Sequence, residues 1–554
     1  MLKEMEDVGD KIVWREWGEE AFAEAREKNR PLLLDISAVW CHWCHVMDET
    51  TYAHPGVIAL INAECVPVRV DNDLRPDINA RYNSGGWPTT VFLTASGDIL
   101  AGATYMTAEQ MLDALHKVTS YHRTHQMEIA SASLEARKRS GLGVARSAGE
   151  LRPKAVDEVV GSVVAAYDPE FGGFGLEPKF PMTEALVLLL EQSHLRQDER
   201  LRSVVQDSLA QMAKGGLHDG VEGGFFRYST TRDWSVPHYE KMLEDQVGLV
   251  MALARAGMQE VLGETLGWLD QVLRNPDSHL HGGSQDADEE YYKLDMSARS
   301  AHGAPTVDRR VNVAWNAHLA VALLEAAAFS GQEGLRERAR GIMAELKATR
   351  YHIGEGWEHA DGVGGLLADQ AWGLLACVRA YQWGLGEQWL QVAQEMASVL
   401  EARWGDGVRG GYFDIAHTGA GRLGERMKPL NENAVVALAL SELDTLVDAG
   451  GQGHRQQARR ALESVAGLVE RNGPMAALWA RVVDRLEPSV KVSTKNWEVA
   501  AAALKAHPYV VIDPQGGESA VVCVGTSCVA SGVGAGEVDK ALKDAWLQER
   551  SRRD

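Results

Sequence analysis

The 554-residue sequence has little positive charge, few cysteines and no long uncharged apolar run. Its 78 acidic residues outnumber 56 basic ones, and the net charge is −22. A surface this acidic repels a phosphate backbone, so we expect no nucleic-acid partner. No segment reaches the roughly 18 uncharged apolar residues of a membrane span, so we expect no membrane partner. The acidic start, Met1–Asp7, has no apolar segment typical of a secretory signal, and we expect a cytoplasmic protein.

Six cysteines are too few for a disulfide framework in a chain of this length. The sequence places them at Cys41, Cys44, Cys65, Cys377, Cys523 and Cys528. The first two form a C-x-x-C motif and the last two a C-x₄-C motif. The middle two lie alone in apolar runs, and we expect them to be inert core thiols. The C-x₄-C pair is either two free thiols or a second redox pair that exchanges electrons with the first.

The length predicts two or three domains. Residues 1–123 alternate short apolar strands with amphipathic helices, which predicts an α/β domain. Residues 124–150 are polar and rich in small residues, and we interpret them as a linker. Residues 151–490 show long helical patterns broken by Gly-Gly pairs. Residues 491–554 again contain both strand-like and helical patterns, which predict a small α/β appendage.

Paired helices that repeat every 40–50 residues or so predict an array of helical hairpins, stacked or toroidal. The periodicity alone does not distinguish an open solenoid from a closed toroid. The predicted helices are 154–167, 182–213, 239–273, 312–330, 333–349, 366–383, 387–404, 431–449 and 456–471.

The C-x-x-C motif follows a predicted buried strand, 31–36, and opens a predicted helix, 41–52. There the first thiol faces unpaired backbone N–H groups and the positive end of the helix dipole, which favour the thiolate. Cys41 is thus the expected nucleophile, and Cys44, one turn deeper, the residue that resolves a mixed disulfide. A protonated His42 would further stabilise the Cys41 thiolate.

Two further residues fit this chemistry. Asp35 lies six residues before Cys41, the spacing at which thioredoxins bury an aspartate that handles the proton of the second cysteine. Pro88 precedes a predicted strand, 89–94, in the position of the thioredoxin cis-proline. Two alternatives remain. The motif could serve packing alone, or its Cys-His-x-Cys-His could bind a metal, although no second ligand pair is evident. We therefore predict a redox dithiol with no metal and no cofactor.

The sequence resembles the spermatogenesis-associated thioredoxin-like proteins and their bacterial YyaL-like relatives. In the first domain the matching stretches are Trp17-Gly18-Glu19-Glu20-Ala21-Phe22, Cys41-His42-Trp43-Cys44-His45-Val46-Met47, Val70-Asp71, Arg75-Pro76-Asp77 and Gly85-Gly86-Trp87-Pro88. Downstream they are Phe171-Gly172-Gly173-Phe174, Pro178-Lys179-Phe180-Pro181, Gly223-Gly224-Phe225-Phe226-Arg227-Tyr228, Trp234 to Leu243, Ser284-Gln285-Asp286-Ala287-Asp288, Trp315-Asn316 and Asn433-Ala434. The resemblance implies a thioredoxin-like domain followed by an (α/α)₆ toroid, similar to six-hairpin glycosidases and N-acylglucosamine 2-epimerases. Fold transfers better than function in such a comparison.

Sugar-active toroids use carboxylates or histidines for acid/base chemistry and tryptophans to stack on sugars. The candidate residues here are Arg227, Trp234, His238, Glu240, Asp245, Asp286, Asp288, Trp315 and Asp369. We expect His238 and Glu240 to open a helix after Pro237. Asp245 lies five residues beyond Glu240, off one narrow face, so a carboxylate pair needs Asp286 or Asp288. Each residue also has an ordinary structural interpretation, such as a helix cap or a turn.

Three functions remain open. The first is a thiol–disulfide oxidoreductase that acts on a disulfide-bearing protein or a small thiol, with the helical domain recognising the substrate. The second is a carbohydrate-active enzyme, glycosidase-like or epimerase-like, with a sugar ligand in the toroid and a regulatory thioredoxin-like domain. The third is a non-catalytic binding scaffold.

Overall fold

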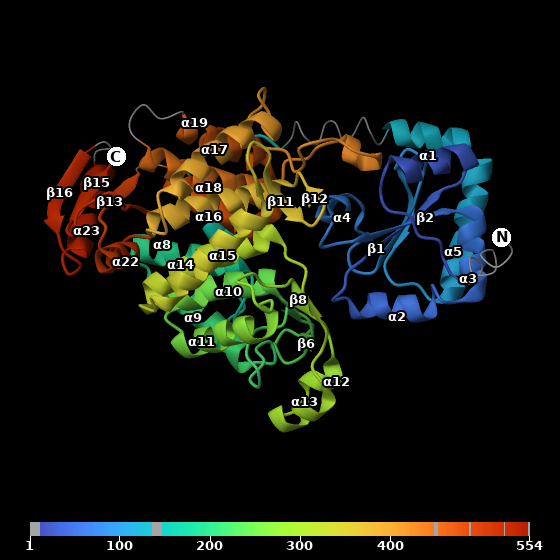
Figure 1. Cartoon of the computed structure of the whole chain (residues 1–554), viewed down its shortest axis with the longest axis horizontal. Coiled ribbons are helices and arrows are strands. Elements are labelled where there is room, and N and C mark those ends of the chain that lie inside the picture. The colour runs from blue at the N-terminus through green and yellow to red at the C-terminus, as the bar shows by residue number, and fades with distance from the viewer. Residues whose placement is uncertain (1–10, 136–146, 448–452, 487–488, 526, 552–554) are drawn as a thin grey trace. The chain divides into compact units, whose positions relative to one another are not determined.

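The computed structural model describes residues 11–135, 147–447, 453–486, 489–525 and 527–551 (Figure 1). The chain forms two compact units. The first comprises residues 1–145 and 415–427, and the second comprises residues 146–414 and 428–554. Within the predicted linker, residues 126–135 are helical, whereas residues 136–146 lie outside the described residues.

The first unit contains a four-stranded sheet in the order β2-β1-β3-β4. Its strands are β1 (Leu32–Ser37), β2 (Val66–Asp71), β3 (Thr89–Leu93) and β4 (Ile99–Ala103). Strand β1 pairs in parallel with β2 and antiparallel with β3, and β4 is antiparallel to β3. Strands rich in β-branched and leucine residues are buried on both faces, which requires helices on both sides. This is the predicted thioredoxin-like α/β fold.

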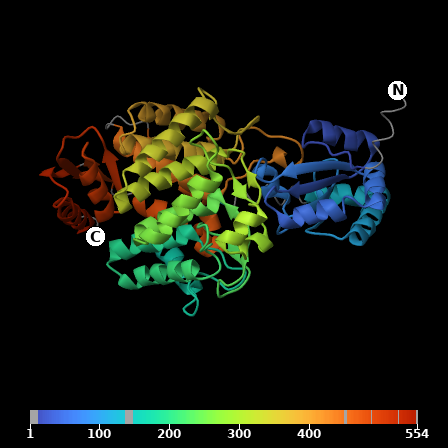
Figure 2. The same cartoon turned by 60° about the horizontal axis from the view of Figure 1, so that its bottom comes forward.

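Helices cover both faces of this sheet (Figure 2). Leu33 and Phe92 face a core built from α2, α3 and α5. Trp17 and Phe22 pack edge-to-face at 4.9 Å near α1, and Trp17 also contacts Tyr82 of α4. The helices are α1 (Glu19–Lys28), α2 (His42–Thr50), α3 (Pro55–Glu64), α4 (Pro76–Tyr82) and α5 (Ala108–Thr124).

A distant segment, residues 415–427, completes the first unit. The backbone N–H of Arg422 donates to the Tyr82 hydroxyl at 2.8 Å, and the Arg81 guanidinium donates to the carbonyls of Arg422 and Glu425. Gly421 has a φ of +62°, and a Cβ there would lie 2.7 Å from the Tyr82 hydroxyl oxygen, so only glycine fits. The sequence offers no local signal for this long-range contact.

The second unit is a closed toroid of helical hairpins. Within the described residues the inner helices are α8 (Thr183–Arg196), α10 (Leu243–Ala256), α14 (Val313–Ser330), α16 (Leu367–Gln382), α18 (Leu430–Leu446) and α21 (Ala477–Arg485). Each contacts the next, and α21 contacts α8, which closes the ring. The outer helices are α7 (Ala155–Ala166), α9 (Glu199–Lys214), α11 (Gln259–Trp268), α15 (Gly334–Arg350), α17 (Gln388–Arg403) and α19 (His454–Val465). The structure thus decides between solenoid and toroid.

Several predicted helices are divided. The predicted helix 182–213 is two helices, because Gln197 adopts a left-handed φ of +54° and Asp198 caps the second. The predicted helix 239–273 begins only at Leu243 and breaks at Gly257, which has a φ of +80°. It ends in a π-helical turn, Leu269–Leu273. The predicted helix 456–471 ends at Val465 and continues as short turns: Ala466–Leu468, Val469–Asn472 and Gly473–Ala476.

The loops that enter the inner helices carry the shorter elements. These are β5 (Tyr228–Ser229), β6 (Pro237–His238), β7 (Lys241–Met242), β8 (Ser284–Gln285), α12 (Glu289–Tyr292), α13 (Met296–His302), β9 (Val307–Asp308), β10 (Tyr351–His352), β11 (Gly356–Ala360), β12 (Val363–Gly364) and a 3₁₀ turn (Gly421–Gly424). Helix α14 is long and apolar enough to cross a membrane, but 78% of it is buried within the protein, as expected of a core helix.

The same lysine–aspartate ion pair recurs in three of these loops. In each, an aspartate precedes a Gly-Gly pair, and a buried lysine further along donates to it. The pairs are Lys179–Asp168 at 2.9 Å, Lys241–Asp219 at 2.6 Å and Lys428–Asp406 at 2.8 Å. The second and third lysines also donate to a glycine carbonyl of the pair, at Gly223 and Gly410. These buried charges are paired and therefore hold the loops in place.

An amide side chain near the start of each of four inner helices fixes the adjoining loop. Each accepts a backbone N–H and donates to the carbonyl of the same loop residue, as a strand partner would. The pairs are Gln246 with Phe225, Asn316 with His281, Gln370 with Trp357 and Asn433 with Tyr412. The Asn316 and Asn433 positions that carry the family resemblance are thus structural.

A ring of alternating charges joins the C-terminal halves of the inner helices. Every inner helix contributes one buried member: Glu191, Arg255, Glu325, Arg379, Glu442 and Arg485. In ring order, the shortest N–O distances are 3.4 Å for Glu191–Arg255, 2.9 Å for Arg255–Glu325, 3.8 Å for Glu325–Arg379, 2.5 Å for Arg379–Glu442, 3.7 Å for Glu442–Arg485 and 2.5 Å for Arg485–Glu191. Arg481 adds a further pair to Glu191 at 2.9 Å. Each charge has a partner on either side, which offsets its desolvation.

A second small sheet follows the toroid, as predicted. Its elements are β13 (Val490–Ser493), α22 (Trp497–Ala506), β14 (Val510–Asp513), β15 (Ala520–Val524), β16 (Ser527–Val533) and α23 (Val538–Ser551). The order is β14-β13-β15-β16. Strand β13 is parallel to β14 and antiparallel to β15, and β15 is antiparallel to β16. The strand order and directions are thus the same as those of β2-β1-β3-β4 in the first unit. Ile512 N–H donates to Gln382 of α16 at 3.0 Å, which fixes this sheet to the toroid.

Candidate active sites

The C-x-x-C motif forms a disulfide at the first turn of α2. Cys41 is the N-cap, and its Sγ accepts a hydrogen bond from the Cys44 N–H at 3.2 Å. This is the environment that stabilises a thiolate at Cys41 once the disulfide is reduced. The Trp87–Pro88 bond is cis, as predicted. Pro88 immediately precedes Thr89, which pairs with Ile36 near the end of β1, so the proline and the motif adjoin the same end of these two central strands.

Aromatic side chains surround the motif. Trp40 donates from Nε1 to Asp73 at 2.8 Å, and its ring meets that of Trp87 edge-to-face at 5.3 Å. Cys41 is 4% exposed and Cys44 is 3% exposed, whereas the Trp43 side chain is 50% exposed. His42 is exposed, and its ring meets Trp43. Both cysteines are therefore largely shielded from solvent in the disulfide form.

Asp35 is buried in β1, where it forms part of a charged network. Arg69 donates to it at 2.7 Å and Tyr52 donates at 3.3 Å. Arg69 also pairs with Asp48 and lies 4.4 Å from the centre of the Trp14 ring. Burial raises the pKa of Asp35 to about 6, although the charge of Arg69 opposes this. A carboxyl with such a pKa can both accept and release a proton near neutral pH.

The second candidate site lies at the N-terminal face of the toroid, which we define by the first turns of the inner helices. In three of these helices a predicted candidate lies ten positions before a member of the charged ring: Asp245 before Arg255, Trp315 before Glu325 and Asp369 before Arg379. In a fourth helix Glu432 stands in the same relation to Glu442. Ten residues of helix span about 15 Å. Since successive hairpins return the chain in the same sense, the inner helices run in parallel and these residues form one layer.

Arg227 lies between two acidic candidates on this face, Glu240 and Asp245, and Glu240 in turn contacts His238. Its guanidinium lies 3.7 Å from a Glu240 carboxylate oxygen and 4.0 Å from Asp245 Oδ2. Glu240 is buried and forms a close hydrogen bond to Nδ1 of His238. The prediction that His238 and Glu240 open a helix is wrong. His238 lies in β6 and pairs with Tyr228, and the bend that follows brings Glu240 back to Arg227.

Three acidic side chains of this face, Asp245, Glu244 and Glu432, have raised pKa values. Burial raises the pKa of Asp245 to about 7; Arg227 opposes the rise, and the charges of Glu244 and Glu240 add to it. Among the described residues none donates a hydrogen bond to Asp245 Oδ2. Burial likewise raises the pKa of Glu244 and of Glu432, although the Glu244 side chain is exposed.

Sequence reasoning missed four residues here: Glu244, Glu432, His318 and Trp372. His318 stacks on Trp372 with 3.6 Å between ring centres, and both are half-buried. Burial lowers the pKa of His318 to about 3, so the imidazole is neutral at pH 7. His318 and Trp372 each lie three residues beyond a candidate, Trp315 and Asp369, on the same helix. A spacing of three residues along an inner helix is the signal that identifies them.

Other predicted residues have structural surroundings. Trp234 is fully buried and donates to the Phe171 carbonyl at 2.9 Å, so its ring is not available for stacking on a ligand. Asp369 is also buried, and it accepts from the Ala314 N–H and lies 3.0 Å from His359 Nδ1.

Asp288 caps α12 through the Tyr291 N–H, and Asp286 accepts from the next residue's N–H. Asp288 thus has the helix-capping role that is its ordinary structural interpretation. Trp315 remains half-buried, with Gly283 against its ring.

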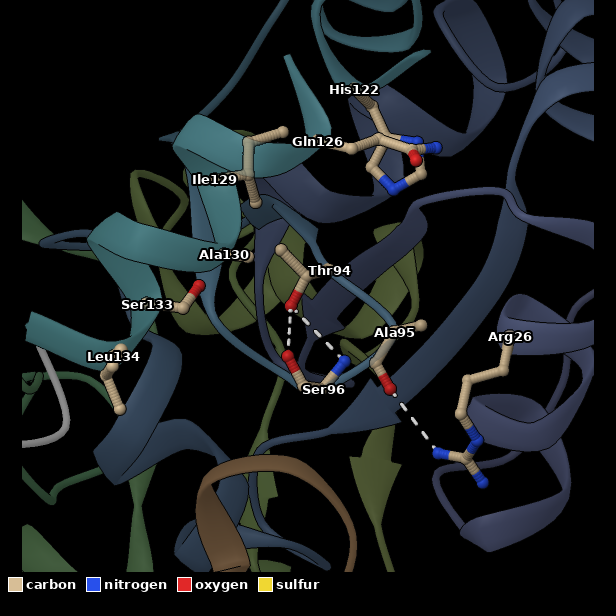
Figure 3. Close-up of a pocket in the computed structure, with 10 residues that line it drawn as sticks. All are labelled: Arg26, Thr94, Ala95, Ser96, His122, Gln126, Ile129, Ala130, Ser133 and Leu134. Atoms are coloured by element: carbon tan, nitrogen blue, oxygen red, sulfur yellow. Dashed lines mark hydrogen bonds between the residues drawn. The ribbon is translucent and has the colours of Figure 1, made fainter. Parts of the chain in front are cut away.

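A separate pocket of about 550 Å³ lies in the first unit (Figure 3). Its walls are Arg26 of α1, the turn after β3, His122 of α5 and the helical residues 126–134. Arg26 donates to the Ala95 carbonyl across it at 3.4 Å. The pocket contains none of the predicted site residues. In the part of the chain that the structure describes, no group of three or more His, Cys, Asp or Glu side chains is arranged to hold a metal.

Fold and sites together define a two-part protein: a thioredoxin-like domain with a C-x-x-C disulfide, and an (α/α)₆ toroid. Residues 4–139 match the family model Thioredox_DsbH, described as a protein of unknown function, DUF255. Human spermatogenesis-associated protein 20 is 33% identical over 324 residues, which is 53% of this chain and 41% of that protein. The rat protein is 33% identical over 311 residues, 50% of this chain and 39% of its own length. The chain is similar to these spermatogenesis-associated thioredoxin-like proteins, and it spans about two fifths of the length of the curated relatives it matches.

Solved structures resemble each part. A D-mannose isomerase covers 60% of this chain and 98% of its own, at 14% identity and a TM-score of 0.46. A DsbH oxidoreductase covers 22% of this chain and 93% of its own, at 18% identity and a TM-score of 0.19.

Proposed function

We propose that the protein is a thiol–disulfide oxidoreductase that acts through Cys41 and Cys44. The observation that carries the proposal is the hydrogen bond from the Cys44 N–H to Sγ of Cys41 at the start of α2. Such a bond, with the helix dipole, stabilises the thiolate that attacks a disulfide. Buried Asp35, with its pKa of about 6, supports proton transfer at the second cysteine.

In the reducing direction, the Cys41 thiolate attacks one sulfur of a substrate disulfide. A mixed disulfide forms, and the other substrate sulfur leaves as a thiolate. Asp35 takes the proton of the Cys44 thiol, and Cys44 then attacks Sγ of Cys41. The second substrate sulfur leaves, and the Cys41–Cys44 disulfide of the structure is restored. An external dithiol must reduce it for another cycle. A disulfide-bearing protein or a small thiol is the expected partner.

Insulin reduction by dithiothreitol tests this proposal. We expect Cys41→Ser to lower the rate to that of dithiothreitol alone. Cys65→Ala is the matched control, because Cys65 is a buried free thiol of the same unit, and burial raises its pKa to about 12. Equal activity in wild type and Cys41→Ser would refute the proposal.

A second candidate function is acid/base chemistry on a carbohydrate at the N-terminal face. The raised pKa of Asp245, about 7, beside the Arg227–Glu240–His238 group favours it. A carboxyl that is partly protonated at neutral pH is suited to general acid catalysis. The half-buried rings of Trp315 and Trp372 offer surfaces for sugar stacking.

Calorimetric titration with a panel of monosaccharides and disaccharides tests the second candidate. Asp245→Asn should weaken or abolish any binding detected with wild type. Asp288→Asn is the control, because Asp288 caps α12. Binding that is unchanged by Asp245→Asn, or absent for all sugars, counts against a carbohydrate site here.

A further inference from the structure

The second cysteine pair forms a disulfide in the C-terminal sheet. Cys523 of β15 and Cys528 of β16 are joined, and the two residues lie directly opposite each other in the antiparallel pairing. Strand β16 is the edge of the sheet. The disulfide therefore lies at the end of an edge hairpin, apart from the Cys41–Cys44 motif in the chain.

The two cysteine residues differ in exposure. Cys523 is 7% exposed, whereas Cys528 is an exposed residue between exposed neighbours, Ser527 and Val529. A thiolate attacks a disulfide through the sulfur that it can reach, and the other sulfur leaves. Access alone therefore directs attack to Cys528 and makes Cys523 the leaving group.

Charge favours the same direction. Lys491 of β13 lies directly opposite Cys523 on its other side, and directly opposed residues in an antiparallel pair point to the same face. An ammonium group next to a sulfur stabilises the thiolate. Lys491 is 29% exposed at its side chain and lies 3.8 Å from Asp513, a separation that leaves the pair loose.

The face that carries this group is the more open one. Lys491, Ser493 and Val521 on it are half-buried, whereas Val490 and Val492 on the opposite face are buried. A soluble thiol can thus reach the sulfur of Cys528 without opening of the sheet.

We propose that Cys523–Cys528 is a second thiol–disulfide exchange site, at which a soluble thiol or dithiol attacks Sγ of Cys528 and Cys523 leaves as a thiolate held by Lys491. The Cys528–Cys523 bond breaks, and a mixed disulfide forms on Cys528. A second thiol then attacks that mixed disulfide. The products are the oxidised external disulfide and the two reduced cysteines, Cys523 taking its proton from water. This site does not depend on the function proposed for Cys41 and Cys44.

Glutathione is the probe for the test. The full chain with Cys41→Ser and Cys44→Ser is oxidised, exposed to glutathione in native buffer, quenched with acid and maleimide, and analysed by peptide mass spectrometry. We expect the glutathione adduct on Cys528, followed by release of both thiols. An adduct mainly on Cys523, or equally on both cysteines, overturns the proposal. So does a disulfide that resists glutathione until urea unfolds the sheet, because it then acts only as a structural link.

Lysine substitutions test the role of charge. Lys491→Met should slow adduct formation by about threefold, the effect expected for loss of a cation beside the leaving sulfur. Lys495→Met is the matched control, because Lys495 lies close by in sequence and pairs with the exposed Glu518 at 3.3 Å. Circular dichroism confirms that both variants are folded. Equal rates in the two variants overturn the assignment of Lys491.

Discussion

Loss of one charge from the ring of the toroid should destabilise the protein measurably. Arg255 donates to Glu325 at 2.9 Å, and Arg379 lies 3.8 Å from the same carboxylate. These arginines hold the pKa of Glu325 at about 2, against an ordinary value of 4.5, even though burial alone would raise it. The difference between the folded and unfolded pKa values of Glu325 corresponds to about 3 kcal/mol in favour of the folded state at pH 7. Glu325→Gln keeps the shape and removes the charge, so the loss should be about 3 kcal/mol.

The pH dependence follows from the direction of the pKa change. A carboxyl with a lowered pKa in the folded state stabilises the protein above its unfolded pKa, and this contribution is lost as the pH falls toward 2. Less than half of the difference between wild type and Glu325→Gln should therefore remain at pH 3. Hydrogen exchange of the α14 amides measures the free energy of opening in the toroid without interference from the first unit.

Two comparisons sharpen this test. Arg379→Met combined with Glu325→Gln should cost less than the sum of the two changes, since the double variant leaves fewer unpaired charges. Glu333→Gln removes an exposed charge, 71% exposed, from a pair with Arg336, and it should change stability by less than about 0.5 kcal/mol. A Glu325→Gln variant as stable as Glu333→Gln at pH 7 would show that the ring contributes nothing to stability.

Three further changes have defined outcomes. Asp35→Asn should exceed wild type by only about 0.6 kcal/mol at pH 4 but by about 3 kcal/mol at pH 8 in exchange of the β1 amides. The reason is that a pKa raised to about 6 costs stability as the pH rises from the unfolded value of 3.8 through 6. Equal differences at both pH values would refute this. Lys241→Met should lower the thermal midpoint through a loss of about 3 kcal/mol, because it leaves the buried Asp219 with one cation fewer. Tyr82→Phe should cost about 1 kcal/mol and speed exchange in residues 415–427, where it removes the bond from Arg422; unchanged exchange would argue against that contact.

Local patterns predict most of the first unit. The strands of the thioredoxin-like sheet follow from short apolar runs, and a helix starting near Cys41 follows from the position of the motif after a strand. The cis Pro88 follows from the likeness to thioredoxins. The contribution of residues 415–427 does not, because it depends on contacts between residues more than 300 positions apart, such as Arg81 with Arg422. The amino-acid composition around each residue gives no indication of such a contact.

The candidate site of the toroid is less predictable. Trp234, Asp288 and Asp369 have the chemistry of site residues in the sequence, but in the structure they serve packing, helix capping and contacts between elements. Glu244 and Glu432 read as ordinary first-turn acids that complement the helix dipole. Only the closed ring shows that they share one face, since closure depends on the contact of α21 with α8.

Trapping of the mixed disulfide tests the central claim most directly. In Cys44→Ser the residue that resolves the intermediate is absent, so an attack by Cys41 on a peptide disulfide should leave half of the peptide covalently bound. We predict that mass spectrometry finds this peptide on Cys41. A Cys44→Ser protein that is folded and reduced, yet carries no peptide at Cys41, would contradict the account.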